Sequence, residues 1–155
     1  MALTASLAIA FVLCTGILAG ALVAVDRAVV PMLLHLPRQT WSEVHRLLDP
    51  GFDPLMPTVN KVALVTGLGL TLLAPGTAAR AAFATAFAGV AGVALVSELS
   101  NVRMNRRIDE WAAVGEIPDG WRALRARWAR ANRWRTASAV LAFAGALCGC
   151  WLAWA

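Results

Sequence analysis

Polar side chains that could do chemistry recur at helical spacing in the second half of the chain. Glu98, Asn101 and Asn105 follow one another at intervals of three and four residues. A second set between two apolar segments has matching intervals: Trp121, Arg125, Trp128, Asn132 and Arg135. Residues at these intervals share one face of an α-helix. If the two helices pack antiparallel, we expect the two faces to line one polar pocket.

Glu98 is the candidate base of this pocket. No charged residue separates it from Arg80, so it lies at the end of a long uncharged segment. A carboxylate in such a place is costly unless it is paired, hydrated or functional. It could accept a proton from a bound substrate, or it could be a helix-end charge paired with one of the nearby arginines.

Amide and guanidinium groups in the pocket could orient a carbonyl or phenol and stabilise its anion. The same asparagines could instead satisfy helix ends or bridge two helices. We predict the following roles: Glu98, Asn105, Asn132 and Arg135 as catalytic, and Asn101, Trp128, His35, His45 and Asn60 as substrate-binding. Trp128 would stack on an aromatic ring.

The two histidines offer a metal-dependent alternative. His35, His45 and Glu98 together would give two imidazoles and one carboxylate, a set that suits copper or iron. The histidines are ten positions apart, however, and no tight ligand spacing is present. We therefore predict no metal and no cofactor, with this three-residue set as the alternative.

Composition predicts a membrane protein. The chain has 155 residues, 59% of them hydrophobic, and a mean hydropathy of +0.65. We predict a single all-α domain over 1–155, an integral membrane four-helix bundle with spans at about 2–34, 55–74, 77–113 and 119–155. Helices three and four are expected to extend beyond the bilayer. No basic segment precedes the first span, which favours a retained helix over a signal peptide.

The segment between spans one and two predicts a short interfacial helix. Thr40 is placed to cap its start, Trp41 to anchor it in the membrane surface, and Asp49-Pro50-Gly51 to end it in a turn. In the first span, Gly16 and Gly20 are spaced to let a neighbouring helix approach closely.

Charge distribution predicts the orientation. The net charge of +5 comes from basic residues that flank apolar segments, which argues against nucleic-acid binding and for contact with membrane lipids. Nine arginines lie between the apolar parts of spans three and four, and three lie between the apolar parts of spans one and two, whereas only Arg80 lies near the hairpin between spans two and three. We predict that the two arginine-bearing segments are cytoplasmic and both termini outside the cell membrane. The oligomeric state stays open.

Two motifs resemble the anthrone-oxygenase-like family of small membrane proteins. These are NVRMNRRIDEW at 101–111 and RWARANRWRT at 127–136. Arg103 and Met104 stand where the family often has Pro and Leu, and Asn132 stands where many members have His, which removes any role that needs an imidazole there. The four spans and the Leu36-Pro37 element followed by an amphipathic helix extend the resemblance over the whole chain.

The resemblance implies a monooxygenase that acts on an anthrone- or polyketide-like aromatic substrate with O₂. Deprotonation of such a substrate gives an electron-rich enolate that can react with O₂ without flavin or haem. Phosphate-binding loops, dinucleotide fingerprints and nucleophile elbows are absent from the sequence. Two alternatives remain: a non-enzymatic membrane scaffold or partner subunit, and a copper- or iron-dependent membrane oxidase.

Overall fold

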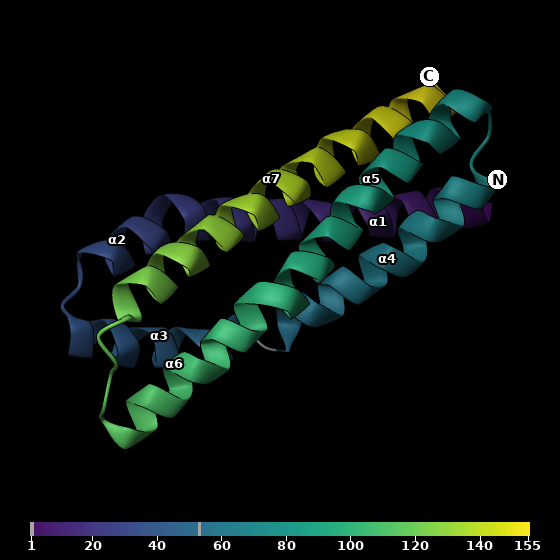
Figure 1. The fold of residues 1–155 in the computed structure, drawn as a ribbon. Coiled ribbons are helices and arrows are strands. Elements are labelled where there is room, and N and C mark those ends of the chain that lie inside the picture. Colours follow the sequence, from purple (N-terminus) through teal and green to yellow (C-terminus); the bar gives the residue numbers. More distant parts are fainter. Residues whose placement is uncertain (1, 53) are drawn as a thin grey trace.

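The computed structural model describes residues 2–52 and 54–155, and within them every regular element is helical, as predicted. Figure 1 shows the arrangement. The elements are α1 (Ala2–Ala24), the π-helical η1 (Val25–Val29), α2 (Val30–His35), α3 (Arg38–Phe52), α4 (Leu55–Leu73), α5 (Thr77–Val96), the π-helical η2 (Ser97–Asn101), α6 (Val102–Val114) and α7 (Trp121–Trp154).

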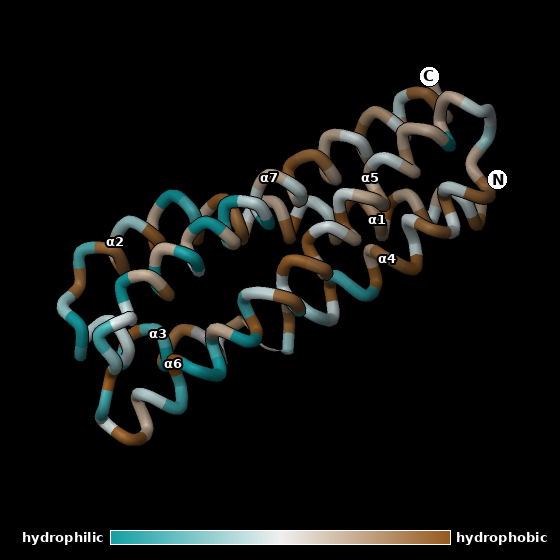
Figure 2. The backbone as a smooth tube through the Cα atoms, in the orientation of Figure 1, coloured by the Kyte–Doolittle hydropathy of each residue, from teal (hydrophilic) through white to brown (hydrophobic). Residues whose placement is uncertain are grey.

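Four continuous helices in the described part of the chain are long and apolar enough to cross a membrane. They span Ala2–His35, Leu55–Leu73, Thr77–Val114 and Trp121–Trp154. Large apolar side chains on their outer surfaces are exposed, among them Leu3, Ile9, Leu13, Val65, Leu72 and Leu141. Such side chains suit contact with lipid, so the fold is that of a multi-pass membrane protein. Figure 2 shows hydrophilic residues gathered at the end opposite the two chain termini.

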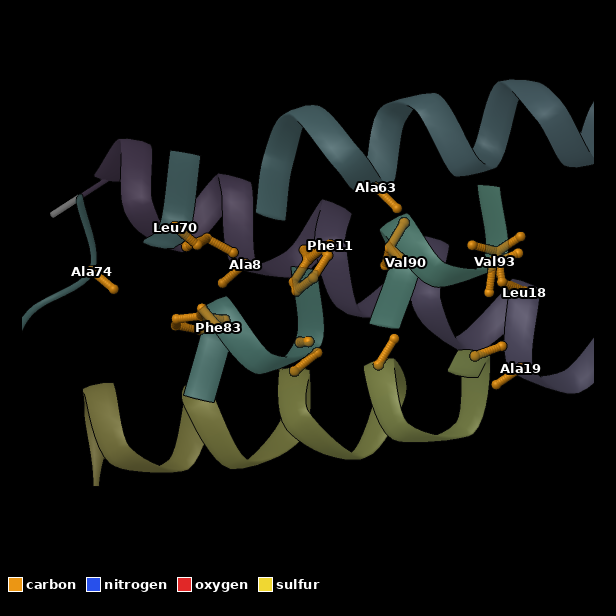
Figure 3. Packing of buried hydrophobic residues seen from close by; sticks show 14 of the residues in the cluster. Ala8, Phe11, Leu18, Ala19, Ala63, Leu70, Ala74, Phe83, Val90 and Val93 are labelled. Carbon is orange, nitrogen blue, oxygen red and sulfur yellow. The ribbon is translucent and has the colours of Figure 1, made fainter. Parts of the chain in front are cut away.

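Small residues set the packing of the four-helix bundle, in which α5 and α7 make the most extensive contact. A Cβ atom built on Gly89 of α5 would lie 2.8 Å from the backbone oxygen of Ser138 in α7. Phe11 and Phe83, seen in Figure 3, pack edge to face with ring centroids 6.3 Å apart. Two glycines admit these rings, because a Cβ at Gly67 or Gly149 would lie 2.7 Å from one of them.

The prediction for the glycine pair of the first span is wrong for Gly20. A Cβ there would meet nothing within 4 Å, whereas one at Gly16 would lie 3.3 Å from the Phe143 ring. Helices approach closely instead at Gly89, where the nearest atom of the neighbouring helix α7 is a backbone oxygen.

Replacing Gly89 by alanine is expected to destabilise the protein, because backbone cannot move aside as a side-chain tip can. Overpacking of this kind costs about 1–3 kcal/mol, which corresponds to a fall of roughly 2–10 °C in Tm. Gly20→Ala is the matched control, and it should be neutral or slightly stabilising because alanine favours helix. Thermal unfolding of both variants in detergent measures the difference, and equal Tm values would refute the packing account.

A second hydrophobic cluster lies beyond the bundle, where α2, α3, α6 and the first turns of α7 meet. Trp41 is fully buried in it, 5.5 Å from the Trp121 ring, so its predicted role as a membrane anchor is wrong. Arg125 Nη1 donates to the carbonyl oxygens of Leu33 (3.2 Å) and Leu36 (3.0 Å). Arg125 thereby satisfies carbonyls at the end of α2 and ties α7 to the first helix.

Helix α3 is longer than predicted. It begins at Arg38, before the expected cap at Thr40, because the Trp41 N–H already donates to the Pro37 carbonyl at 2.8 Å. The predicted turn at 49–51 is helical, since Pro50 lies in the last turn, where it removes only one backbone hydrogen bond. The predicted stop at Gly115 is confirmed: its φ of 76° is the left-handed conformation that ends α6.

Two π-helical turns interrupt the first and third long helices, where the sequence predicted regular helix. The N–H of Val30 bonds to the oxygen of Val25, and that of Val102 to Ser97, each five residues back. Near η1, Pro31 has no N–H and its ring crowds the preceding turn. At η2, the Ser97 hydroxyl donates to the Val93 carbonyl at 2.7 Å and competes with the backbone.

Candidate active site

A cavity of about 490 Å³ lies between the bundle core and the second cluster. Leu18, Leu22 and Val93 of the bundle core line one end, and Leu33 and Trp128 of the second cluster line the other. The volume is in the range of small-molecule sites. Both π-helical turns border it, through Val25 and Val29 on one side and residues 97, 98 and 101 on the other. Wide turns of this kind often occur at functional sites.

The structure brings eight of the nine predicted site residues to this one cavity. They are His45, Asn60, Glu98, Asn101, Asn105, Trp128, Asn132 and Arg135. The ninth, His35, is exposed at the end of α2, and its Nδ1 lies 2.7 Å from the Pro31 carbonyl oxygen. The polar faces of the third and fourth long helices therefore meet at the cavity, except that Trp121 and Arg125 of the predicted face do not line it. The roles of the individual residues stay predictions.

The alternative metal set is not assembled in this structure. His45 and Glu98 line the cavity, but His35 does not. Within the described residues, no group of three or more His, Cys, Asp or Glu side chains is placed to hold a metal ion. The set fails because α2 ends before the cavity and directs His35 back to its own helix.

Three asparagines carry the polar character of the cavity. Asn101 and Asn132 are each 1% exposed, and Asn60 is 8% exposed. Both amide atoms of Asn101, Nδ2 of Asn132 and Oδ1 of Asn60 have no hydrogen-bond partner among the described residues. A buried amide without partners costs about 1–3 kcal/mol. Such a cost is typical of a binding site, where a ligand supplies the missing partners.

His45 is held in the cavity wall by two tryptophans. Its ring lies edge to face against Trp128, with centroids 5.1 Å apart, and against Trp41 at 5.9 Å. Both ring nitrogens are buried without a partner among the described residues. Burial lowers the pKa of His45 from 6.5 to about 4. The imidazole is therefore neutral at physiological pH and able to donate one hydrogen bond to a ligand.

This lowered pKa predicts a pH-dependent stability. Because the folded-state pKa lies below the unfolded value, the contribution is present above pH 6.5 and is lost as the pH falls toward 4. Between pH 7.5 and 5 we expect a loss of about 2 kcal/mol from this group. Thermal unfolding of His45→Asn should show a smaller acid sensitivity than the wild type or the exposed His35→Asn control. Identical pH profiles for all three proteins would contradict burial of the imidazole.

Asn105 positions a neighbouring ring. Its Oδ1 accepts a hydrogen bond from Trp128 Nε1 at 3.1 Å, which joins α6 to α7 across the cavity. This contact fixes the plane of the Trp128 indole, which is 8% exposed. The catalytic role of Asn105 stays a prediction.

Charged side chains form the more exposed part of the cavity lining. Glu98, Lys61 and Arg106 line the cavity and are exposed, and Asp109 lines it and is half-buried. Glu98 forms no ion pair with another described residue. Arg106 and Asp109 line the cavity but were not predicted from the sequence. Asp109 could have been found, because it lies four residues beyond Asn105 on the same helical face.

Comparison of the chain with known proteins finds a match to a protein family. A family model described as anthrone oxygenase matches residues 45–145, which is most of the chain. The matched range begins at His45 and includes seven further predicted residues of the cavity. No curated protein and no solved structure shows a significant match. The family resemblance predicted from the two arginine-rich motifs is thereby confirmed.

Proposed function

The chain belongs to the anthrone oxygenase family, and from this membership we infer that it oxidises a small hydrophobic aromatic ketone with O₂ inside the cavity. The observation that carries this proposal is that Asn101, Asn132 and His45, whose buried polar groups have no partner among the described residues, line the same cavity as Glu98. Their polar atoms suit a carbonyl oxygen, and the apolar remainder of the wall suits aromatic rings.

Glu98 is proposed as the base. An anthrone-type substrate has a ring CH₂ group across the central ring from its ketone. Removal of one proton gives an enolate whose negative charge lies largely on the ketone oxygen. Neutral His45 and the amide N–H groups of Asn101 and Asn132 would donate hydrogen bonds to this oxygen, and Arg135 would contribute positive charge. These donors favour the anion over the neutral ketone, which makes the proton transfer easier.

The enolate is electron-rich enough to react with O₂ directly. One electron passes to O₂, and the two radicals combine to form a C–O bond at the former CH₂ carbon. The resulting peroxide anion takes the proton held by Glu98 and becomes a hydroperoxide. Glu98 then removes the second proton from that carbon, which forms the C=O bond, breaks the O–O bond and expels hydroxide. The hydroxide takes this second proton from Glu98 and leaves as water. The CH₂ group becomes C=O with loss of four electrons. O₂ accepts these four electrons and ends as one carbonyl oxygen and one water, so this route needs no flavin or haem.

Turnover of anthrone by the purified protein tests the proposal. We expect O₂ uptake and appearance of anthraquinone, in equal amounts, when the protein is held in lipid nanodiscs. Empty nanodiscs are the control, because anthrones also oxidise without a catalyst. A rate no higher than that of empty nanodiscs, with anthrone shown to be bound, would overturn the oxygenase assignment.

The polar end of the molecule, which holds the cavity, is proposed to face the cytoplasm. The nine arginines at the facing ends of the third and fourth long helices belong to α6 and the first half of α7, at this end. Positive residues favour the cytoplasmic side, which places both termini outside. A C-terminal fusion to alkaline phosphatase should then be active and one to a fluorescent protein dark. The reverse pattern would refute this orientation.

A further inference from the structure

The inner end of the cavity differs in chemistry from the rest. Its lining consists of apolar side chains from α1, α4 and α5 that belong to membrane-crossing helices: Leu18, Ala21, Leu22, Leu64, Val93 and Ala94. Leu18, Leu22 and Val93 are also members of the bundle core. We call this part the inner section. Every polar lining residue of the cavity lies outside it.

The boundary of the inner section falls at one level on several helices. Asn60 precedes Leu64 by one helical turn, and Ser97 follows Val93 by one turn. On α7, the Thr136 hydroxyl donates to the carbonyl of the inner-section residue Leu22 at 3.2 Å. Asn132 precedes Thr136 by one helical turn, so it lies one turn away from the inner section. Polar groups therefore end, and apolar lining begins, within one turn of helix, or about 5 Å.

A ligand group in the inner section would find no hydrogen-bond partner. A hydroxyl or carboxylate placed there would lose its water without compensation, whereas a hydrocarbon would not. We propose that the inner section is a hydrocarbon subsite, which rests on the proposed function for the identity of the ring system. The substrate is then an aromatic ketone whose polar groups lie on one side. Its other side carries an alkyl substituent or an unsubstituted ring edge.

Filling the inner section with a larger side chain tests this subsite. Ala94→Leu narrows it from α5, and Ala21→Leu narrows it independently from α1, which keeps the test open if one variant does not fold. Ala88→Leu is the matched control, because Ala88 is exposed on the same helix α5 and does not line the cavity. The probes are anthrone, an anthrone with a butyl group on a terminal ring, and its isostere with a 3-carboxypropyl group.

We expect Ala94→Leu to lower kcat/KM for butyl-anthrone roughly tenfold relative to Ala88→Leu. If kcat/KM for unsubstituted anthrone falls equally, the inner section binds a ring edge. If kcat/KM falls only for butyl-anthrone, the inner section binds an alkyl group. Both results support a hydrocarbon subsite. With the wild type, the carboxypropyl compound should be at least roughly 100-fold poorer at equal free concentration. Equal kcat/KM of the wild type for the carboxypropyl and butyl compounds would overturn the proposal. Equal kcat/KM of Ala94→Leu and Ala88→Leu for butyl-anthrone would also overturn it.

Binding separates failure of the subsite from failure of the oxygenase proposal. Quenching of tryptophan fluorescence reports ligand near Trp128, with Trp128→Phe as the reference. If no anthrone is turned over, yet butyl-anthrone binds Ala88→Leu about tenfold tighter than Ala94→Leu, the subsite stands and the oxygenase proposal fails. If turnover is normal and the two variants bind alike, the subsite fails and the oxygenase proposal stands.

Discussion

Replacement of Glu98 by glutamine is expected to lower kcat for anthrone oxidation by at least roughly 100-fold, the usual range for loss of a general base. Glutamine keeps the size and polarity of the side chain but cannot accept the proton. Substrate binding should stay within about twofold of the wild type, because the hydrogen-bond donors and the cavity wall are unchanged. Anthraquinone formation in nanodiscs measures kcat, and tryptophan quenching measures binding.

The control for this substitution is Glu110→Gln. Glu110 is exposed on α6 and does not line the cavity, so its variant removes an equal charge from the same long helix. It should retain wild-type kcat. An unchanged kcat in Glu98→Gln would remove Glu98 as the base, and an equal fall in both variants would point to a general effect of charge.

Replacement of Asn132 by leucine is expected to change activity and stability in opposite directions. Loss of a donor to the developing oxyanion should lower kcat roughly 100-fold. The same change removes a buried amide nitrogen that has no partner among the described residues, at a site only 1% exposed. Relief of that cost, about 1–3 kcal/mol, should raise Tm of the ligand-free protein by several degrees.

The opposite signs distinguish a binding residue from a structural one. An asparagine that bridged helices would lower Tm when replaced, and the fall in activity would follow from unfolding. Arg133→Leu provides the control, because Arg133 is the exposed neighbour of Asn132 on α7 and does not line the cavity. It should leave kcat unchanged. A lower Tm in Asn132→Leu would contradict a ligand-binding role for this amide.

Helical spacing predicted much of the cavity because long helices preserve periodicity. Glu98, Asn101 and Asn105 on one helix, and Trp128, Asn132 and Arg135 on the other, do line one cavity. The all-α class and the number of apolar helices followed from uninterrupted hydropathy. The two helical faces and the apolar segments depend on residues close in sequence, which is why the sequence was sufficient for them. That the two faces meet followed only under the assumption that the helices pack antiparallel.

Features that depend on contacts distant in sequence were not predicted. The π-helical turn at Ser97–Asn101 has no distinctive sequence signal. Trp41 was expected at the membrane surface, because its amphipathic segment does not reveal which surface it covers. The structure buries it under α7 beside Trp121, and this packing brings His45 to the cavity and makes its imidazole neutral. His35 has the same side-chain chemistry but is excluded because α2 ends too early.

Lys61 shows a different kind of limit. Its place near the start of the second span is fully explained by a side chain that reaches the membrane surface. The structure also places it in the cavity lining with Asn60. Both explanations fit the same position, so spacing alone could not distinguish them. Whether Lys61 lines the cavity depends on how α4 packs against the other helices, and the residues around Lys61 do not determine this packing.

Isotope labelling tests the central claim most directly. Wild-type protein, Glu98→Gln and empty nanodiscs would each be supplied with anthrone under ¹⁸O₂ in unlabelled water, and the anthraquinone analysed by mass spectrometry. We expect the wild type to form product with one ¹⁸O atom per molecule, far faster than Glu98→Gln or empty nanodiscs. Product formed by the wild type with its new oxygen from water, or at the rate of empty nanodiscs, would contradict this claim.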